Sequence, residues 1–257
     1  RYLLYAYSMC CFIAAACVWR FVPDPKRNSN RETDQHDHKR KGVLRRLKIV
    51  LQSPSVWLQA VVIIAAYSTF KMFDNYGLYA EDAYGVSPTE SAKLTAYLSF
   101  LRAVAALAAG WIADRVLGVS PSIQFCFGLL IACYATLLYV TPSQEFVWLM
   151  TTTMVISCSA FFALRGIYFA LLEESGTPRE LTGTAVGVIC FVGFTPEIFM
   201  PPLTGWLIRE ARSAGNVVTG YNQIFLILMA LSLLGLFSAA ALHWISARRR
   251  PASDTVT

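Results

Sequence analysis

The chain has 257 residues, of which 56% are hydrophobic and only 15% are charged, whereas a soluble domain has about 25% charged residues. Its net charge of +6 does not indicate nucleic-acid binding, because the basic residues gather in a few loops between apolar blocks. Composition therefore excludes an ordinary soluble domain and predicts a membrane protein with no nucleic-acid partner.

Seven apolar blocks, separated by polar loops, are long enough to cross a bilayer, which takes about 20 residues of helix. We expect an all-α membrane protein whose blocks form seven transmembrane helices, numbered here as the first to seventh predicted spans. They cover residues 2–22, 57–80, 93–113, 121–140, 146–172, 183–208 and 222–246.

The first span follows directly on Arg1, without an initiator Met or the basic segment that opens a signal peptide. We therefore expect a fragment whose upstream part is missing; a processed N-terminus is the alternative. The polar segment 23–56 comes next. From Val43 to Val56 its apolar residues recur at helical spacing with basic residues between them, which predicts an amphipathic helix at the membrane surface.

The distribution of Lys and Arg predicts the orientation. With alternating spans, the loops 23–56, 114–120 and 173–182 and the tail 247–257 share one side and carry most of the basic residues. Cytoplasmic loops are enriched in Lys and Arg. We therefore expect the C-terminus in the cytoplasm and the start of the chain outside, with the protein in the plasma membrane, the inner membrane of a bacterium.

No metal or cofactor is predicted. His36 and His38 flank Asp37 in the polar segment but lack a third ligand. The cysteines have neither zinc-site spacing nor the loop positions of a disulfide framework, and we expect them to be small buried hydrophobic residues. All of them lie in apolar spans: Cys10, Cys11, Cys17, Cys126, Cys133, Cys158 and Cys190.

Five ionisable residues lie inside the spans, where each charge costs about 2.5–3.5 kcal/mol even on lenient insertion scales. Such residues persist where they face a partner, a water-filled cavity or a transported solute. The first, fourth and seventh spans have none at mid-depth. The five residues are Lys71, Asp74, Arg102, Arg165 and Glu197.

The loop after the third span reads Gly110-Trp-Ile-Ala-Asp114-Arg115-Val-Leu-Gly118. It resembles the signature loop of the major facilitator superfamily of transporters, roughly G-x-x-x-D-R-x-G-R. Gly110, Asp114 and Arg115 match, but Gly118 is one place late and no basic residue follows it. An Asp at a helix end can accept hydrogen bonds or pair with a cation and so latch one conformation; a solubilising turn is the alternative.

In that superfamily the loop follows the second helix of each six-helix half. The resemblance implies that 1–22 is the last helix of the N-terminal half and 23–56 the cytoplasmic linker. It further implies that 57–246 is the six-helix C-terminal half and 247–257 a cytoplasmic tail. The missing N-terminal half would then be a partner of this chain, alongside the lipid bilayer.

A second resemblance lies in the fifth and sixth spans. Arg165 to Glu174, Gly183 to Gly187 and Gly193 to Glu197 are similar to the YihN-type group of bacterial facilitators, distantly similar to organic-anion porters. Gly183 and Gly187 also form a GxxxG pair, which predicts close helix packing in lipid. Pro196, near Gly193, predicts a kink or local unwinding.

The resemblance implies that the second and fifth spans line the transport path and that the first, fourth and seventh face lipid. The positions of the buried charges agree with this division. We expect a secondary transporter that moves a small anionic solute, such as a carboxylate, phosphate or sulfonate, by alternating access with ion or proton coupling. The candidate substrate-binding residues are Lys71, Arg102, Arg165 and Tyr76, since guanidinium groups suit oxyanions.

Asp74 and Glu197 are the candidates for ion or proton coupling, because a carboxylate in a dry cavity takes up a proton more readily. A structural reading stays open for the same charges: Lys71 and Asp74 share a helix face, and Arg102 or Arg165 pairs with an acid such as Glu197. A seven-helix receptor has the same topology, but the Gly110–Gly118 loop opposes it. An enzyme is not predicted, because no HExxH, GxSxG or P-loop motif is present.

Overall fold

The computed structural model describes residues 2–21, 45–174 and 178–249, and all of its regular elements are helices. The chain divides into two units, Arg1–Arg45 and Arg46–Thr257. The first unit contains α1 (Tyr2–Phe21), which matches the first predicted span in extent. Residues 22–44, with His36 and His38, lie outside the described residues.

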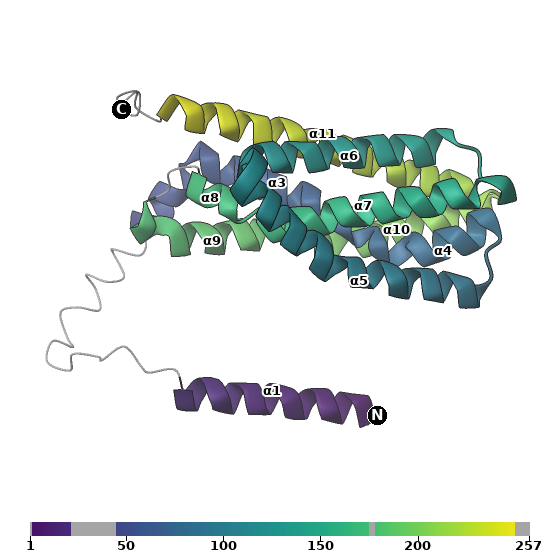
Figure 1. Cartoon of the computed structure of the whole chain (residues 1–257), viewed down its shortest axis with the longest axis horizontal. Helices are drawn as coiled ribbons and strands as arrows, with labels where there is room; N and C mark the ends of the chain where they lie inside the picture. The colour runs from purple at the N-terminus through teal and green to yellow at the C-terminus, as the bar shows by residue number, and fades with distance from the viewer. Residues whose placement is uncertain (1, 22–44, 175–177, 250–257) are drawn as a thin grey trace, which may run out of the picture. The chain divides into compact units, whose positions relative to one another are not determined.

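The second unit is a bundle of helices that run broadly side by side (Figure 1). Residues 46–51 form a short helix before it, with Arg46 and Lys48 exposed and Val50 buried. The elements of the bundle are α3 (Pro54–Lys71), α4 (Phe73–Tyr84), α5 (Pro88–Ile112), the π-helical η1 (Ala113–Leu117), α6 (Val119–Tyr139), the 3-10 helix η2 (Gln144–Phe146), α7 (Val147–Ile167), α8 (Ala170–Glu174), α9 (Arg179–Gly193), α10 (Pro196–Ser213) and α11 (Val217–Arg249).

Six helical stretches of this unit are long and apolar enough to cross a membrane, which confirms the last six predicted spans. Four of the stretches extend past both ends of their predicted blocks, whereas the stretches that begin at Val119 and Gln144 begin earlier and end earlier than the predicted spans 121–140 and 146–172. They cover Pro54–Tyr84, Pro88–Leu117, Val119–Tyr139, Gln144–Ile167, Leu181–Ser213 and Val217–Arg248.

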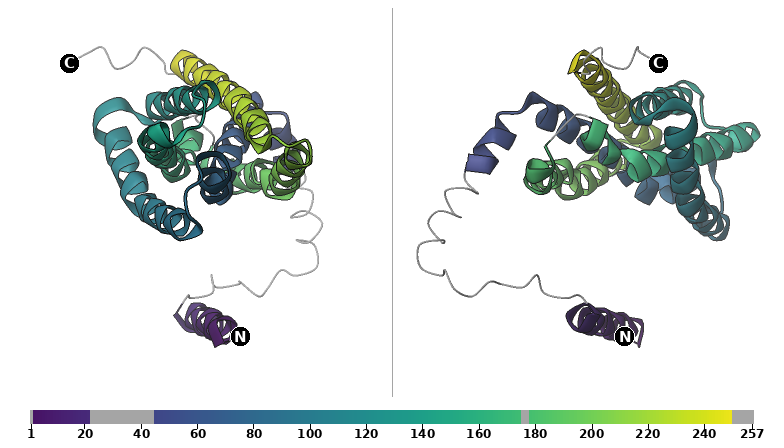
Figure 2. Two further views of the ribbon diagram at one scale, coloured as in Figure 1. Left: turned by 90° about the vertical axis from the view of Figure 1, so that its right-hand side faces the viewer. Right: turned by 60° about the vertical axis from the view of Figure 1, so that its left-hand side comes forward.

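Helix α3 is the hub of the bundle, because it contacts α7, α9, α10 and α11. Helix α5 packs chiefly on α7 and lies at the margin (Figure 2, left). The spans predicted to face lipid, α6 and α11, pack tightly on each other, whereas α5 and the α9–α10 stretch are the least buried of the six. Burial within this unit therefore does not separate lipid-facing from path-lining helices.

Three spans are interrupted. The second span changes at Met72 to hydrogen bonds between residues three apart. There Met72 N donates to the carbonyl of Thr69, and Asn75 N donates to the carbonyl of Met72. The fifth breaks at Tyr168 between α7 and α8, and the sixth breaks between Gly193 and Pro196. These interruptions create helix ends inside the bundle, and most of the buried charges lie at them.

The burial of the cysteines differs between the two units. Cys126, Cys133 and Cys158 are buried, as predicted, whereas Cys190 is half-buried. On α1, Cys10, Cys11 and Cys17 are exposed. The expectation of burial is therefore wrong for α1 within its own unit, because a single helix has no neighbouring helix to cover its side chains.

Among the residues that the structure describes, no neighbouring helix packs closely on the predicted GxxxG pair. A Cβ at Gly183 or Gly187 would meet no atom within 4 Å among the described residues. The close approaches lie elsewhere: a Cβ at Gly193 would be 2.6 Å from Cγ2 of Ile63, and one at Gly220 would be 2.7 Å from the carbonyl oxygen of Leu207. A small-residue pair permits close packing, but a neighbouring helix must face it.

We expect Gly220→Ala to destabilise the bundle, because the new Cβ meets a backbone oxygen of α10 that cannot move aside. The unfolding temperature of the purified protein should fall by about 3–10 °C, as for an overpacked core site. Gly183→Ala is the matched control, since its Cβ enters open space and alanine favours a helix. An equal effect of the two substitutions would contradict the packing described here.

Candidate functional site

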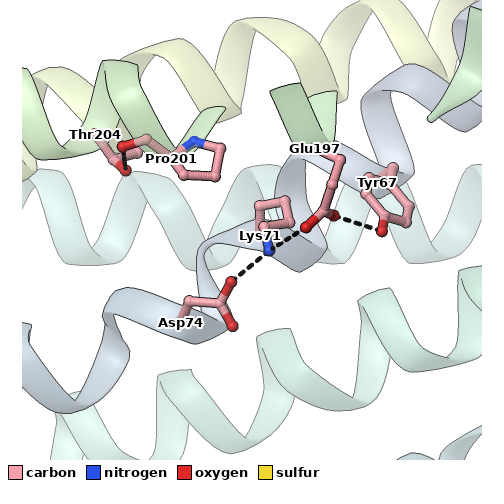
Figure 3. A network of polar contacts seen from close by, with 6 residues as sticks. All are labelled: Tyr67, Lys71, Asp74, Glu197, Pro201 and Thr204. Atoms are coloured by element: carbon pink, nitrogen blue, oxygen red, sulfur yellow. Dashed lines mark hydrogen bonds and ion pairs between the residues drawn. The ribbon is translucent and has the colours of Figure 1, made fainter. Parts of the chain in front are cut away.

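The charged side chains predicted from the sequence converge on the last turn of α3. Lys71 Nζ lies 2.6 Å from Oδ2 of Asp74 and 3.3 Å from Oε1 of Glu197. The hydroxyl of Tyr67, one turn earlier on α3, donates to Oε2 of Glu197 at 2.7 Å. Figure 3 shows this chain of contacts from Tyr67 through Glu197 and Lys71 to Asp74. The Lys71 side chain is only 12% exposed, whereas each carboxylate is 54% exposed.

Two arginines lie near aromatic rings of the last two turns of α3. The Arg165 guanidinium carbon, from α7, lies 4.2 Å from the ring centre of Phe70 and 5.5 Å from that of Tyr67. That of Arg102, from α5, lies 5.8 Å from the ring centre of Phe70 and 5.4 Å from that of Phe162. Aromatic faces attract cations. Among the described residues, neither arginine has a carboxylate within ion-pair distance.

Helix ends explain how these charges are tolerated at depth. Lys71 and Arg165 lie in the last turns of α3 and α7, and Asp74 and Glu197 in the first turns of α4 and α10. A helix carries partial negative charge at its C-terminus and partial positive charge at its N-terminus, so each of the four has the favourable sign. The interruptions of the spans therefore partly offset the cost of burying the charges.

A cavity of about 130 Å³ adjoins the ion pairs. Lys71, Asp74 and Asn75 line it from one side, and Pro201, Thr204 and Gly205 of α10 from the other. Thr204 and Pro201 lie beside the charged chain in Figure 3. The cavity is smaller than a typical pocket for a drug-sized ligand, so it suits a solute of a few heavy atoms.

The structure does not bring Tyr76 to this site. Its side chain is fully buried, and its hydroxyl lies 2.7 Å from Oγ of Ser157 on α7. Tyr76 therefore joins α4 to α7 in the interior of the bundle. Tyr67 takes part instead, and sequence reasoning missed it; the available signal was its position four residues before Lys71, on the same helix face.

The structural alternatives can also be compared with the geometry. Lys71 and Asp74 do pair, as the structural reading of the sequence expected. Arg102 and Glu197 do not pair, and Arg165 reaches Glu197 only indirectly, since Tyr67 lies between them as ring partner of one and hydrogen-bond donor to the other. The charges thus form one connected cluster, with its two arginines held over aromatic rings.

The signature-like loop forms η1 at the end of α5. Asp114 and Arg115 are exposed, and neither forms an ion pair within the part of the chain that the structure describes. Gly118 has a φ of 83°, a conformation that favours glycine, which accounts for a glycine at the position that departs from the family pattern. A Cβ at Gly110 would meet no atom within 4 Å.

No group of three or more potential metal ligands occurs within residues 2–21, 45–174 and 178–249. The neighbourhood of Lys71 is a charged, partly exposed site between helix ends. Cations and hydroxyl groups there can bind an oxyanion, and the half-exposed carboxylates can exchange with other partners.

Comparison with known proteins gives a consistent result. The family model described as Major Facilitator Superfamily matches residues 1–201. The inner membrane protein YqcE of Escherichia coli is 24% identical over 202 residues, covering 77% of this chain and 47% of the relative. Mouse monocarboxylate transporter 12 is 26% identical over 229 residues, covering 78% of this chain and 45% of the relative.

The inner membrane protein YihN of Escherichia coli is 21% identical over 252 residues, covering 96% of this chain and 58% of the relative. The chain therefore spans about half the length of the relatives it matches. No solved structure matches it.

We expect Lys71 and Glu197 to be energetically coupled. In a double-mutant cycle of Lys71→Gln and Glu197→Gln, the free energy of unfolding in mixed micelles should show a coupling of about 0.2–1 kcal/mol, as for other partly exposed ion pairs. Lys71→Gln alone should destabilise more than Glu197→Gln, because Lys71 is more buried and has two carboxylate partners. The control is a second cycle that combines Glu197→Gln with Lys93→Gln. Equal coupling energies in the two cycles would contradict the pairing of Lys71 with Glu197.

Proposed function

Because the chain belongs to the major facilitator superfamily, a family of transporters and not of enzymes, we propose that it forms part of a secondary transporter for a small anionic solute. Members of this family are multi-pass integral membrane proteins, so a transported solute and the lipid bilayer are its general partners. Family membership also disfavours the seven-helix receptor that the sequence left open. Transport would proceed by alternating access with ion or proton coupling.

The excess of positive charge at the site carries the proposal of an anionic solute. The cluster has three cations, Lys71, Arg102 and Arg165, and two acids, Asp74 and Glu197. Lys71 pairs with both acids, whereas the two arginines have aromatic rather than carboxylate partners within the described residues. Guanidinium N–H groups bind oxyanions in a paired geometry. An anion that reaches the cluster would thus find hydrogen-bond donors that no acid of the bundle already uses.

A monocarboxylate is the solute class we favour. The cavity beside Lys71 has a volume of only about 130 Å³, which suits a small solute with one charged group. One relative bears the name monocarboxylate transporter, which supports the same class. Phosphates and sulfonates share the oxyanion chemistry and are the competing anions in the experiment below.

Coupling and orientation complete the proposal. Asp74 and Glu197 share Lys71 and are each more than half exposed, which leaves them accessible to a proton or another ion.

Asp114 and Arg115 are proposed to latch one conformation. Two relatives are named inner membrane proteins, which supports a bacterial inner membrane; we place the C-terminus in the cytoplasm, with a further N-terminal half completing the transport path.

We expect Arg165→Gln to weaken anion binding about tenfold or more, the usual cost of losing a charge-assisted hydrogen bond. The full-length natural protein would be titrated with acetate, pyruvate, benzoate, methanesulfonate, inorganic phosphate and glucose, followed by uptake assays in proteoliposomes. Arg209→Gln, an exposed change on α10, is the control. Unchanged affinity in Arg165→Gln would contradict its binding role, and preferential binding of glucose would contradict an anionic solute.

We expect Gly205→Leu to block the cavity without unfolding the protein, because a Cβ at Gly205 would meet no atom within 4 Å. Uptake of the bound anion should fall at least about tenfold, since the new side chain occupies the space of a small solute. Gly128→Leu on α6 is the matched control, for its Cβ also enters open space and it does not line the cavity. Normal uptake in a folded Gly205→Leu variant would exclude this cavity as the solute site.

A further inference from the structure

The carboxylate of Glu197 is bound in the way a solute carboxylate would be. One oxygen accepts from the hydroxyl of Tyr67 at 2.7 Å, and the other lies 3.3 Å from Nζ of Lys71. Both donors come from the last two turns of α3, whereas Glu197 comes from the first turn of α10 (Figure 3). A hydroxyl and an ammonium that bind the two oxygens of one carboxylate form a small carboxylate site.

Glu197 is not required to neutralise Lys71. Asp74 lies closer to the ammonium, at 2.6 Å against 3.3 Å, and belongs to the adjoining helix three residues along the chain. If Glu197 moved away, Lys71 would keep a carboxylate partner while Tyr67 and one face of the ammonium became free. The Glu197 side chain is 54% exposed, so water can replace its contacts at little cost.

The site occupied by Glu197 also adjoins open space. Lys71 lines the cavity of about 130 Å³, and Pro201, Thr204 and Gly205 of the same α10 line its opposite side. A small carboxylate that enters this cavity meets the ammonium that Glu197 already contacts. The two carboxylates therefore share the Lys71 ammonium, and the Tyr67 hydroxyl that binds Glu197 lies one turn before Lys71 on α3.

We propose that Glu197 is an internal stand-in for the transported carboxylate: it occupies the Tyr67–Lys71 donor pair in the empty transporter, and the solute competes with it for these donors. This inference rests on the proposed transport of a monocarboxylate. Binding of the solute breaks two polar contacts between α3 and α10, so occupancy of the site releases the first turn of α10. A neutral solute cannot do this, because it offers no anionic group to the donor pair.

The experiment measures equilibrium binding of acetate, pyruvate and benzoate to the full-length natural protein and to Glu197→Gln. Removal of the internal competitor should lower the Kd of the bound carboxylate about two- to fivefold, the range expected for a partly exposed ion pair. Glu210→Gln makes the same change of charge on the same helix, at an exposed position with no ion pair among the described residues. Its Kd should match that of the unmodified protein.

Tyr67→Phe separates direct competition from a general effect of charge. When Tyr67→Phe is made with Glu197 in place, Glu197 and the solute both lose the hydroxyl as a donor, so the Kd of the solute should hardly change. In the Glu197→Gln background only the solute loses a strong partner, and the Kd should rise about threefold or more. A purely electrostatic effect of Glu197 would leave the Kd insensitive to Tyr67→Phe in both backgrounds.

The outcomes distinguish this inference from the proposed function. Tighter binding in Glu197→Gln, with the background-dependent effect of Tyr67→Phe, supports competition. Carboxylate binding that is unchanged or weaker in Glu197→Gln overturns the stand-in and leaves carboxylate transport intact. Failure of all three carboxylates to bind either form overturns the monocarboxylate proposal and this inference together.

Discussion

The ion pairs of Lys71 are the constraint on which the centre of the bundle depends. A nearly buried ammonium must have compensating charge, and here it has two carboxylates, Asp74 from the adjoining helix and Glu197 from α10. The pairing holds the last turn of α3 against the first turn of α10. Helix α3, which carries Lys71, also contacts α7 and α11.

Interrupted helices make this arrangement possible. A continuous helix would place Lys71, Arg165 and Glu197 beside fully hydrogen-bonded backbone, with no dipole to favour either sign. Breaks near Met72, Tyr168 and Thr195 instead create helix ends at the depth of the charges, and each end has the opposite partial charge to its side chain. The same breaks are positions where backbone hydrogen bonding is already reduced, so movement there disrupts less of the helix. Charge and interrupted backbone hydrogen bonding are therefore concentrated in one region of the bundle.

Much of this arrangement could be predicted from the sequence. The exceptions all depend on how each helix is rotated against its neighbours. Runs of apolar residues predicted the six long spans, and the charges inside them predicted the residues that meet in the candidate site, because both patterns depend on the cost of contact between charge and hydrocarbon. Tyr67, on α3, was missed and Tyr76, on α4, was expected at the site, although both belong to the same predicted span. Which of two tyrosines on one span faces the charges depends on the rotation of that span against α7 and α10. The close approaches at Gly193 and Gly220, rather than at the Gly183–Gly187 pair, likewise depend on which neighbour each helix meets.

The sequence by itself determined the membrane class, the spans and the set of charged residues, since these follow from local composition and from the roughly 20-residue thickness of the bilayer. The Gly110–Gly118 loop also indicated the family. Only the tertiary structure decided how the charges are connected: that Lys71 lies between two carboxylates, that Tyr67 bridges Arg165 and Glu197, and that both arginines rest on aromatic rings. These contacts join residues up to 130 positions apart. Periodicity along one helix carries no information about the distance and rotation between two helices, which packing alone determines.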